Sequence, residues 1–307
     1  AYGIKSGVGV IGDTVVSMEQ ARQLLLDNFG VDFHDRELLR ELASSERYLE
    51  LVTAPQITGK PKLGIDVSRD GAGRGLRHSI EITVANLYAQ GKWKISGELS
   101  KKASEAIERV TRIDEASLLK GETIPEKTWS YLEKSVWPRL FESKGVVVQG
   151  FGKVGMTLLE QLSEYGIRIL GVSDRSGAVI GDGLDLKELV KVKQSTGCVT
   201  EAKKNVTRVI EGPDGNEAVL ETPCDILVPA AMESCVHAEN APRISTVIEA
   251  CGSNDPNTAA AERILNDSGV VVIYDFLANS GGVIVGYFEW LRNYSDRLNY
   301  ESTRIHG

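Results

Sequence analysis

The sequence predicts an α/β fold in which helices cover both faces of a doubly wound, mostly parallel sheet. From residue 145 onward, short apolar runs alternate with stretches of helical periodicity, and a glycine-rich turn joins the first run to the first helix. Strands are expected at 145–149, 167–172, 225–228, 246–250 and 270–273, and helices at 154–165, 185–195, 257–267 and 282–292.

The glycine-rich turn predicts dinucleotide binding. Gly150, Gly152 and Gly155 fit the pattern G-x-G-x-x-G, and Asp174 ends the second expected strand 24 residues after Gly150. Dinucleotide-binding sequences place an acid about 20 residues after such glycines. The first glycine permits a sharp turn, the second lets a pyrophosphate reach the backbone, and the third allows close helix packing. Together these features predict a Rossmann-like unit; a turn that only packs is the alternative.

Length and composition are those of an ordinary globular protein. The 307 residues are 42% hydrophobic and 25% charged, with a formal net charge of −8. An acidic chain argues against a nucleic-acid partner, and no apolar run approaches the roughly 18 residues of a membrane span. We therefore expect neither nucleic acid nor membrane as a partner.

The cysteines indicate a reducing compartment. Cys198, Cys224, Cys235 and Cys251 form no C-x-x-C pair, and the chain has four histidines. This spacing suggests no zinc site and favours reduced structural thiols. We expect a cytoplasmic protein, or one of an organellar matrix, without a bound metal.

The chain is expected to divide into two regions. Residues 1–55 form an N-terminal extension, and residues 56–307 form the dinucleotide-binding domain. The extension should contain a strand near Ser6–Val16 and helices at Met18–Asn28 and Asp35–Val52. In the domain we expect a glycine-rich loop at 56–75, a helix at about Leu76–Gln90, a helical insertion at about 93–142 and a small hairpin around Pro213–Gly215.

Three long sequence blocks stand in a familiar order: VQGFGKVG at 148–155, CDILVPAA at 224–231 and LANSGGVIVGYFEW at 277–290. Together they resemble the cofactor-binding domain of glutamate dehydrogenases, in the Glu/Leu/Phe/Val dehydrogenase superfamily. The resemblance covers about residues 53–293, apart from the insertion. Shorter segments also fit it: TGKP at 58–61, GRG at 73–75, NAPR at 240–243 and ACGSNDPNT at 250–258.

The resemblance implies NAD(P)-dependent oxidative deamination of an amino acid, or the reverse amination of a 2-oxo acid, by hydride transfer to or from nicotinamide. It also implies roles for individual residues. The turn residues Gly150, Phe151, Gly152, Lys153, Val154 and Gly155 would hold the pyrophosphate, and Ser173 and Asp174 would face the adenosine ribose. Ala230 and Ala231 would line the other ribose, Asn254 and Asn279 would contact the nicotinamide or its ribose, Gly281 and Gly282 would let a helix approach the ring, and Arg74 would lie near the substrate carboxylate.

The residues after the second strand predict NAD as the cofactor. A carboxylate at Asp174 accepts hydrogen bonds from the ribose 2′-OH and repels a 2′-phosphate. Arg175 beside it can offset that repulsion, so NADP stays open. Plainer interpretations also stay open, with Asp174 starting a turn, Lys153 pointing to solvent and Asn279 capping a helix.

The chain also departs from the family it resembles. We find no counterpart of the lysine-bearing substrate motif or of the Pro-Asp proton-shuttle motif, and we therefore assign no catalytic residue. Gly286 and Ala72 stand where the family usually has serine and threonine, which favours an amino acid other than glutamate. The alternatives are a fragment, a site completed by a separate substrate domain or a homo-oligomer, and a catalytically silent dinucleotide-binding or regulatory subunit.

Overall fold

The computed structural model describes residues 8–11, 14–17 and 70–294. The chain forms two compact units, and the larger one covers Asp70–Val283. In the smaller unit, β1 (Val8–Ile11) pairs antiparallel with β2 (Thr14–Ser17), where we expected one strand. The two helices expected at Met18–Asn28 and Asp35–Val52 lie outside the described residues.

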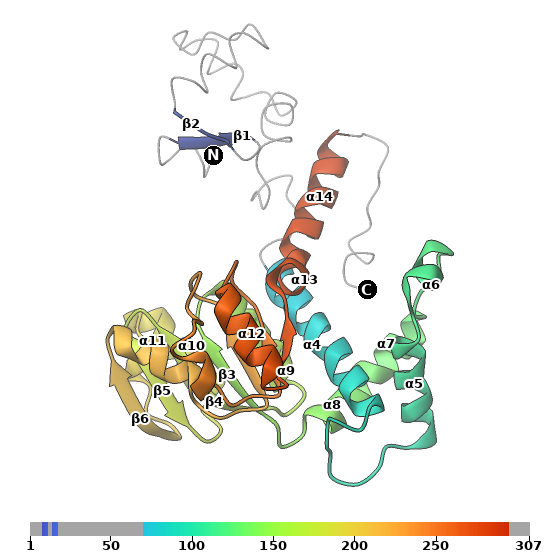
Figure 1. Cartoon of the computed structure of the whole chain (residues 1–307), viewed down its shortest axis with the longest axis horizontal. Coiled ribbons are helices and arrows are strands. Elements are labelled where there is room, and N and C mark those ends of the chain that lie inside the picture. The colour runs from blue at the N-terminus through green and yellow to red at the C-terminus, as the bar shows by residue number, and fades with distance from the viewer. Residues whose placement is uncertain (1–7, 12–13, 18–69, 295–307) are drawn as a thin grey trace, which may run out of the picture. The chain divides into compact units, whose positions relative to one another are not determined.

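A seven-stranded sheet forms the centre of the larger unit, in the order β6-β5-β4-β3-β7-β8-β9 (Figure 1). The five strands β3, β4, β7, β8 and β9 run parallel, while β5 is antiparallel to both of its neighbours. This confirms the predicted fold class and all five expected strands; β5 was not expected, and β6 lies just before Pro213, where the first strand of the expected hairpin would stand. The strands are β3 (Gly145–Gln149), β4 (Arg168–Asp174), β5 (Gly177–Gly181), β6 (Val206–Glu211), β7 (Ile226–Pro229), β8 (Ile248–Ala250) and β9 (Val271–Ile273).

Strand β3 lies at the middle of the core. Val146, Val147 and Val148 are completely buried, because successive side chains point to opposite faces and both faces are covered. Val146 and Val148 belong to the apolar cluster on one face, and Val147 belongs to the cluster on the other. A continuous run of β-branched residues is the pattern expected of such a strand.

Helices cover both faces of the sheet. Apolar residues of α4, α9 and α10 pack on one face, and those of α11 and α12 pack on the other. Among the helices that the structure describes, none combines the length and apolarity needed to cross a bilayer. The helices are α4 (Gly71–Ala89), α9 (Lys153–Ser163), α10 (Leu186–Thr196), α11 (Pro213–Leu220), α12 (Ala259–Asp267), α13 (Asp275–Ala278) and α14 (Ser280–Tyr294), with short 3-10 turns at Val199–Glu201 and Ala241–Arg243.

Two glycine-containing segments are helical where we predicted other structure. Helix α4 begins at Gly71, within the expected loop, and α11 begins at Pro213, at the expected hairpin. A proline fits the first turn of a helix, since its missing N–H has no partner there. At Gly215 a Cβ would lie 2.5 Å from the backbone N of Ala178, so this glycine serves close packing on β5 instead of a turn.

The predicted insertion is helical, and it shares the main core. Figure 1 shows its helices grouped beside α4, away from strands β4 to β6. Trp137, Leu140 and Phe141 are completely buried in the same apolar cluster as residues of α4 and α9. The indole N–H of Trp93 donates to the carbonyl of Leu140 at 2.7 Å, and this hydrogen bond joins the beginning of the insertion to its end. Its elements are α5 (Lys101–Thr111), α6 (Glu115–Leu119), α7 (Glu126–Tyr131), a π-helical turn (Leu132–Val136) and α8 (Trp137–Phe141).

The start of α14 crosses the start of α4 at glycines, and we predict that this crossing tolerates no side chain at Gly281. A Cβ there would lie 2.1 Å from the carbonyl oxygen of Gly71, whereas a Cβ at Gly282 would meet its nearest atom at 3.6 Å. Gly281→Ala should lower the melting temperature by about 5 °C, because overpacking costs about 1–3 kcal/mol. Gly282→Ala is the matched control and should leave it unchanged or higher. Equal melting temperatures for the two variants would contradict the prediction.

Candidate functional site

The sheet has a topological switch point at the carboxyl end of β3, and the strand ends and loops around this point are called the crevice below. The chain continues from β3 to β4 on one side, and later places β7 on the other side of β3. Ligands of open α/β sheets bind at such switch points, outside the carboxyl ends of the strands. Three of the predicted site segments begin at these strand ends: the glycine turn after β3, Ser173–Asp174 at the end of β4, and Ala230–Ala231 after β7.

The glycine turn is built by close backbone contacts. Gly150 has a φ of +101°, and a Cβ there would lie 2.7 Å from the carbonyl oxygen of Ala230. At Gly155 a Cβ would lie 2.3 Å from the oxygen of Gly150. These two positions therefore require glycine, one for the turn and the other for the approach of α9 to the strand.

The start of α9 fits a phosphate group. Among the residues that the structure describes, none has an atom within 4 Å of a Cβ placed at Gly152, so the second glycine leaves the backbone open on that side. Gly152 caps α9 without a side-chain hydrogen bond. A helix start of this kind presents backbone N–H groups and the positive end of the helix dipole. An open, glycine-capped helix start is what the pyrophosphate of a dinucleotide requires.

The two side chains at the end of β4, Ser173 and Asp174, form hydrogen bonds to other residues of the protein. The Ser173 hydroxyl donates to Asn216 Oδ1 at 2.8 Å, and Ser173 is completely buried. Asp174 is 7% exposed and accepts hydrogen bonds from Lys193, Ser176 and Val199. Burial raises the pKa of Asp174, but hydrogen bonds from Lys193 and Ser176 outweigh it and hold the pKa below its usual value. Lys193 was not predicted, because it belongs to no sequence motif.

The remaining predicted residues gather at the other end of the crevice. The N–H of Gly252 donates to the Pro229 carbonyl at 2.9 Å, which joins the loop after β8 to the end of β7. The amide of Asn279 donates to Asn254 Oδ1 at 2.7 Å, so these two predicted contacts are neighbours. Arg74 lies in the first turn of α4, where Gly75 packs against Gly281.

A buried polar cluster underlies the loop that carries Asn254. Glu249 on β8 is completely buried, and its Oε2 accepts a hydrogen bond from Asn257 at 2.7 Å. Its other oxygen, Oε1, has no hydrogen-bond partner within the described part of the chain. Burial raises the pKa of Glu249 to about 7, and burial also raises the pKa of the nearby Cys251 thiol. Sequence reasoning missed Glu249, because a single acid in an apolar run shows no pattern; the buried Cys251 suits a packed thiol.

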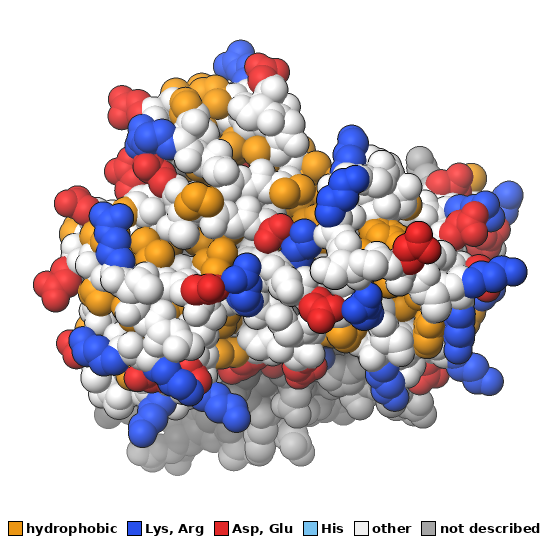
Figure 2. All heavy atoms as spheres, turned by 90° about the horizontal axis from the view of Figure 1, so that it is seen from below, with side chains coloured by type: hydrophobic (Ala, Val, Ile, Leu, Met, Phe, Trp, Pro, Cys, Tyr) orange, Lys and Arg blue, Asp and Glu red, His pale blue; other side chains and the backbone are white. Residues whose placement is uncertain are grey.

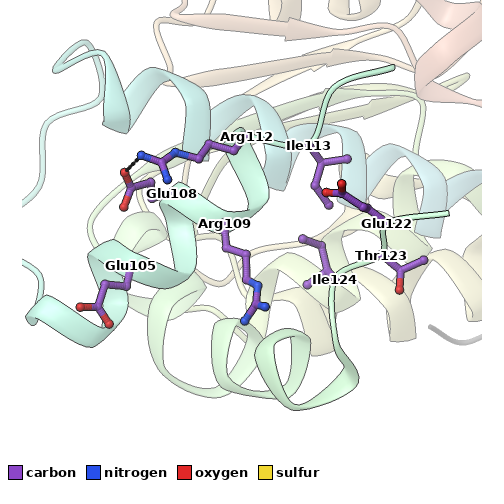
Figure 3. A pocket seen from close by; sticks show the side chains of 8 residues that line it. All are labelled: Glu105, Glu108, Arg109, Arg112, Ile113, Glu122, Thr123 and Ile124. Atoms are coloured by element: carbon purple, nitrogen blue, oxygen red, sulfur yellow. Dashed lines mark hydrogen bonds and ion pairs between the residues drawn. The ribbon is translucent and has the colours of Figure 1, made fainter. Parts of the chain in front are cut away.

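Other surface features lie apart from the crevice. A hollow of about 380 Å³ occurs in the insertion, where Arg109 reaches out from α5 and Arg112 pairs with Glu108 (Figure 3). Three glutamates and two arginines line it, so it favours neither ionic sign. Figure 2 shows acidic and basic side chains interspersed over one face of the molecule, without a continuous basic band among the described residues of that face.

Comparison with known proteins identifies the family. A family model described as Glutamate/Leucine/Phenylalanine/Valine dehydrogenase matches residues 130–305. The chain belongs to this family. The match begins in the helical insertion and covers the glycine turn and every strand of the sheet. The architecture seen here is thus the family's C-terminal, Rossmann-like domain.

Individual relatives agree with this assignment. The chain is 44% identical over 158 residues to an NADP-specific glutamate dehydrogenase of Saccharolobus shibatae, covering 50% of this chain and 35% of the relative. It is 40% identical over 149 residues to a catabolic NAD-specific glutamate dehydrogenase of Bacillus subtilis, covering 48% and 34%. The chain therefore spans about a third of the length of the curated relatives that it matches.

A solved structure shares the fold. The hetero-hexameric glutamate dehydrogenase from Thermus thermophilus superposes with a TM-score of 0.57 at 20% identity, over 90% of this chain and 53% of that one. At this level of identity the likeness concerns the fold, and it agrees with the seven-stranded sheet described above.

We predict that Glu249 makes the stability of the fold depend on pH. The folded pKa of about 7 exceeds the ordinary value of 4.5, so the folded state holds a proton that the unfolded chain releases. The free energy of unfolding should therefore fall as pH rises from about 4.5 to 7, by up to about 3 kcal/mol. Glu249→Gln, which can still accept from Asn257, should remove most of this decline in urea titrations.

The exposed Glu105→Gln is the control and should keep the pH dependence of the wild type. A Glu249→Gln variant whose stability declines as steeply as that of the wild type would contradict the assignment.

Proposed function

We propose that this chain is the cofactor-binding portion of an NAD(P)-dependent amino-acid dehydrogenase, which catalyses oxidative deamination and the reverse reductive amination. The observation that carries the proposal is the glycine turn, whose Gly150 lies against Ala230 at the switch point while Gly152 stays open. Family membership and the names of the relatives, which include NAD-specific and NADP-specific glutamate dehydrogenases, support it.

Different residues of the crevice would contact different parts of the dinucleotide. The N–H groups from Gly152 to Gly155 would hold the pyrophosphate, with Phe151 buried beneath the turn and Lys153 exposed beside it. Ala230 and Ala231 have small side chains, which leave room for a ribose beside β7. The Asn279–Asn254 pair would orient the nicotinamide by side-chain hydrogen bonds. When bound, the nicotinamide would accept or donate the hydride.

The substrate would be an amino acid and its 2-oxo acid. Arg74 would contact the carboxylate, because a guanidinium forms paired hydrogen bonds to such a group. Gly286 and Ala72, in place of the hydroxyl residues usual in the family, favour a side chain other than that of glutamate. The proton-transferring groups are not assigned in this chain.

The proposed activity implies further protein. The Thermus relative is described as hetero-hexameric, and we propose that this chain also assembles, either with copies of itself or with a separate substrate domain. The four cysteines are free thiols, which supports a reducing compartment such as the cytoplasm or an organellar matrix. A silent regulatory subunit is the rival function, and it shares the cofactor site but not the turnover.

Dinucleotide binding is directly measurable in the purified chain. We expect NADH and NADPH to quench tryptophan fluorescence saturably, with energy transfer to the reduced nicotinamide. Gly152→Val should abolish the signal, because a side chain there would occupy the path of the pyrophosphate. Its melting temperature should stay near that of the wild type, because the added atoms start in open space.

Two outcomes would count against the proposal. Absence of saturable binding by either nucleotide would reject the cofactor site itself. Undiminished binding by a folded Gly152→Val variant would place the nucleotide somewhere other than the glycine turn.

A further inference from the structure

The turn between β4 and β5 borders the glycine turn. Arg175 and Ser176 form a two-residue connection after Asp174 at the carboxyl end of β4. The N–H groups of Gly150 and Phe151 both donate to the carbonyl oxygen of Ser173, at 3.0 and 2.8 Å. In dinucleotide-binding sheets, this is where an acid binds the ribose 2′-OH or an arginine accommodates a 2′-phosphate.

The carboxylate of Asp174 has no acceptor position left for a ribose. Its Oδ1 accepts from the backbone N–H of Ser176 at 2.7 Å and from the hydroxyl of the same residue at 2.5 Å. Its Oδ2 accepts from Lys193 Nζ at 2.5 Å and from the N–H of Val199 at 3.0 Å. A carboxylate offers about four acceptor sites, so these four donors fill it.

The charge of Asp174 is also neutralised from within. The Asp174 side chain is 5% exposed and the ion-paired Lys193 side chain is 22% exposed, so solvent screens the pair only partly. Lys193 reaches Asp174 from α10, and it also donates to the Gly197 carbonyl at 2.8 Å, which fixes its position. Because the pair carries no net charge, Asp174 exerts little of the repulsion that an isolated carboxylate exerts on a phosphate.

Arg175 is the exposed charge at the same place. It is the first residue of the turn, its side chain lies at the surface, and no hydrogen bond or ion pair holds it within the part of the chain that the structure describes. A guanidinium is always charged at neutral pH and forms paired hydrogen bonds to phosphate oxygens. The turn therefore presents the guanidinium of Arg175 at the surface, while the carboxylate of Asp174 is occupied by other residues of the chain.

We propose that Arg175 reads the ribose 2′ position and that Lys193, by neutralising Asp174, makes this chain bind NADPH at least as tightly as NADH. The proposal rests on the dinucleotide function proposed above. It reverses the preference for NAD that the presence of Asp174 predicts from the sequence.

The test compares the dissociation constants of NADPH and NADH in the full chain, measured by the fluorescence titration. Arg175→Ala should weaken NADPH binding about tenfold or more, as expected for loss of a charged hydrogen bond, and leave NADH binding unchanged. The control is Arg208→Ala on β6, which removes another exposed arginine. Arg208 lies opposite Ile180 in the β5–β6 strand pair, away from the turn. It should change neither constant.

A second variant tests the neutralising role of Lys193. Lys193→Met should weaken NADPH more than NADH, because Asp174 would then repel the phosphate. A purely structural loss would weaken both equally, so the ratio of the two constants is the readout. Lys191→Met, an exposed position on the same helix, is the matched control.

The outcomes separate the two proposals. If neither nucleotide binds the wild type, the dinucleotide function falls and this inference falls with it. If NADH binds but NADPH binds more weakly, or if Arg175→Ala leaves the ratio unchanged, only the inference is overturned. NADPH binding that is at least as tight and that depends on Arg175 and Lys193 supports it.

Discussion

The organisation of the site depends on one steric constraint, the approach of the glycine turn to the end of β7. Gly150 lies so close to Ala230 that a single added carbon would overlap its carbonyl. The contact is possible because β3 is buried between β4 and β7 and aligned with both by backbone hydrogen bonds. A hydrogen bond from the Ala230 N–H to the Gln149 carbonyl, at 2.7 Å, closes the strand ends together. The geometry of the switch point is therefore set by the sheet itself.

The two ends of the crevice are held in different ways. At the glycine turn, backbone hydrogen bonds hold the chain in place, and the Ser173 carbonyl accepts hydrogen bonds from two N–H groups of the turn. At the opposite end, side chains hold the loops, through Asn279 with Asn254 and through Glu249 with Asn257. Backbone contacts resist substitution, whereas side-chain contacts change with sequence. The first end suits the invariant pyrophosphate, and the second suits a region where chemistry and substrate vary.

The sequence predicted most of the fold, because its signals are local. Valine runs, the glycine turn and the alternation with helices mark every parallel strand. The sequence-based assignment was wrong at Gly71 and Gly215, which were assigned to a loop and a turn. Both glycines lie in helices, where the lack of a side chain allows close packing. The partners of Asp174 were unpredictable for another reason. Lys193 is 19 residues away along the chain and reaches the carboxylate only because the last turn of α10 lies close to the end of β4 in the fold. A motif fixes the identity of a side chain, but tertiary packing decides what remains available to a ligand.

The helices that the sequence analysis assigned to an insertion at about 93–142 have a consequence for how the domain is built. Trp137 and Phe141 share one apolar cluster with Leu76 of α4 and Leu158 of α9, so the insertion completes the helical layer over the sheet. A segment integrated in this way cannot be excised as an independent module, since its removal would expose the flank of the layer to water. It should unfold together with the sheet in a single cooperative transition, and amides of α5 and β3 should share a common protection against hydrogen exchange. A segment that the sequence suggests is an insertion is thus part of the same folding unit as the glycine turn and the strands around it.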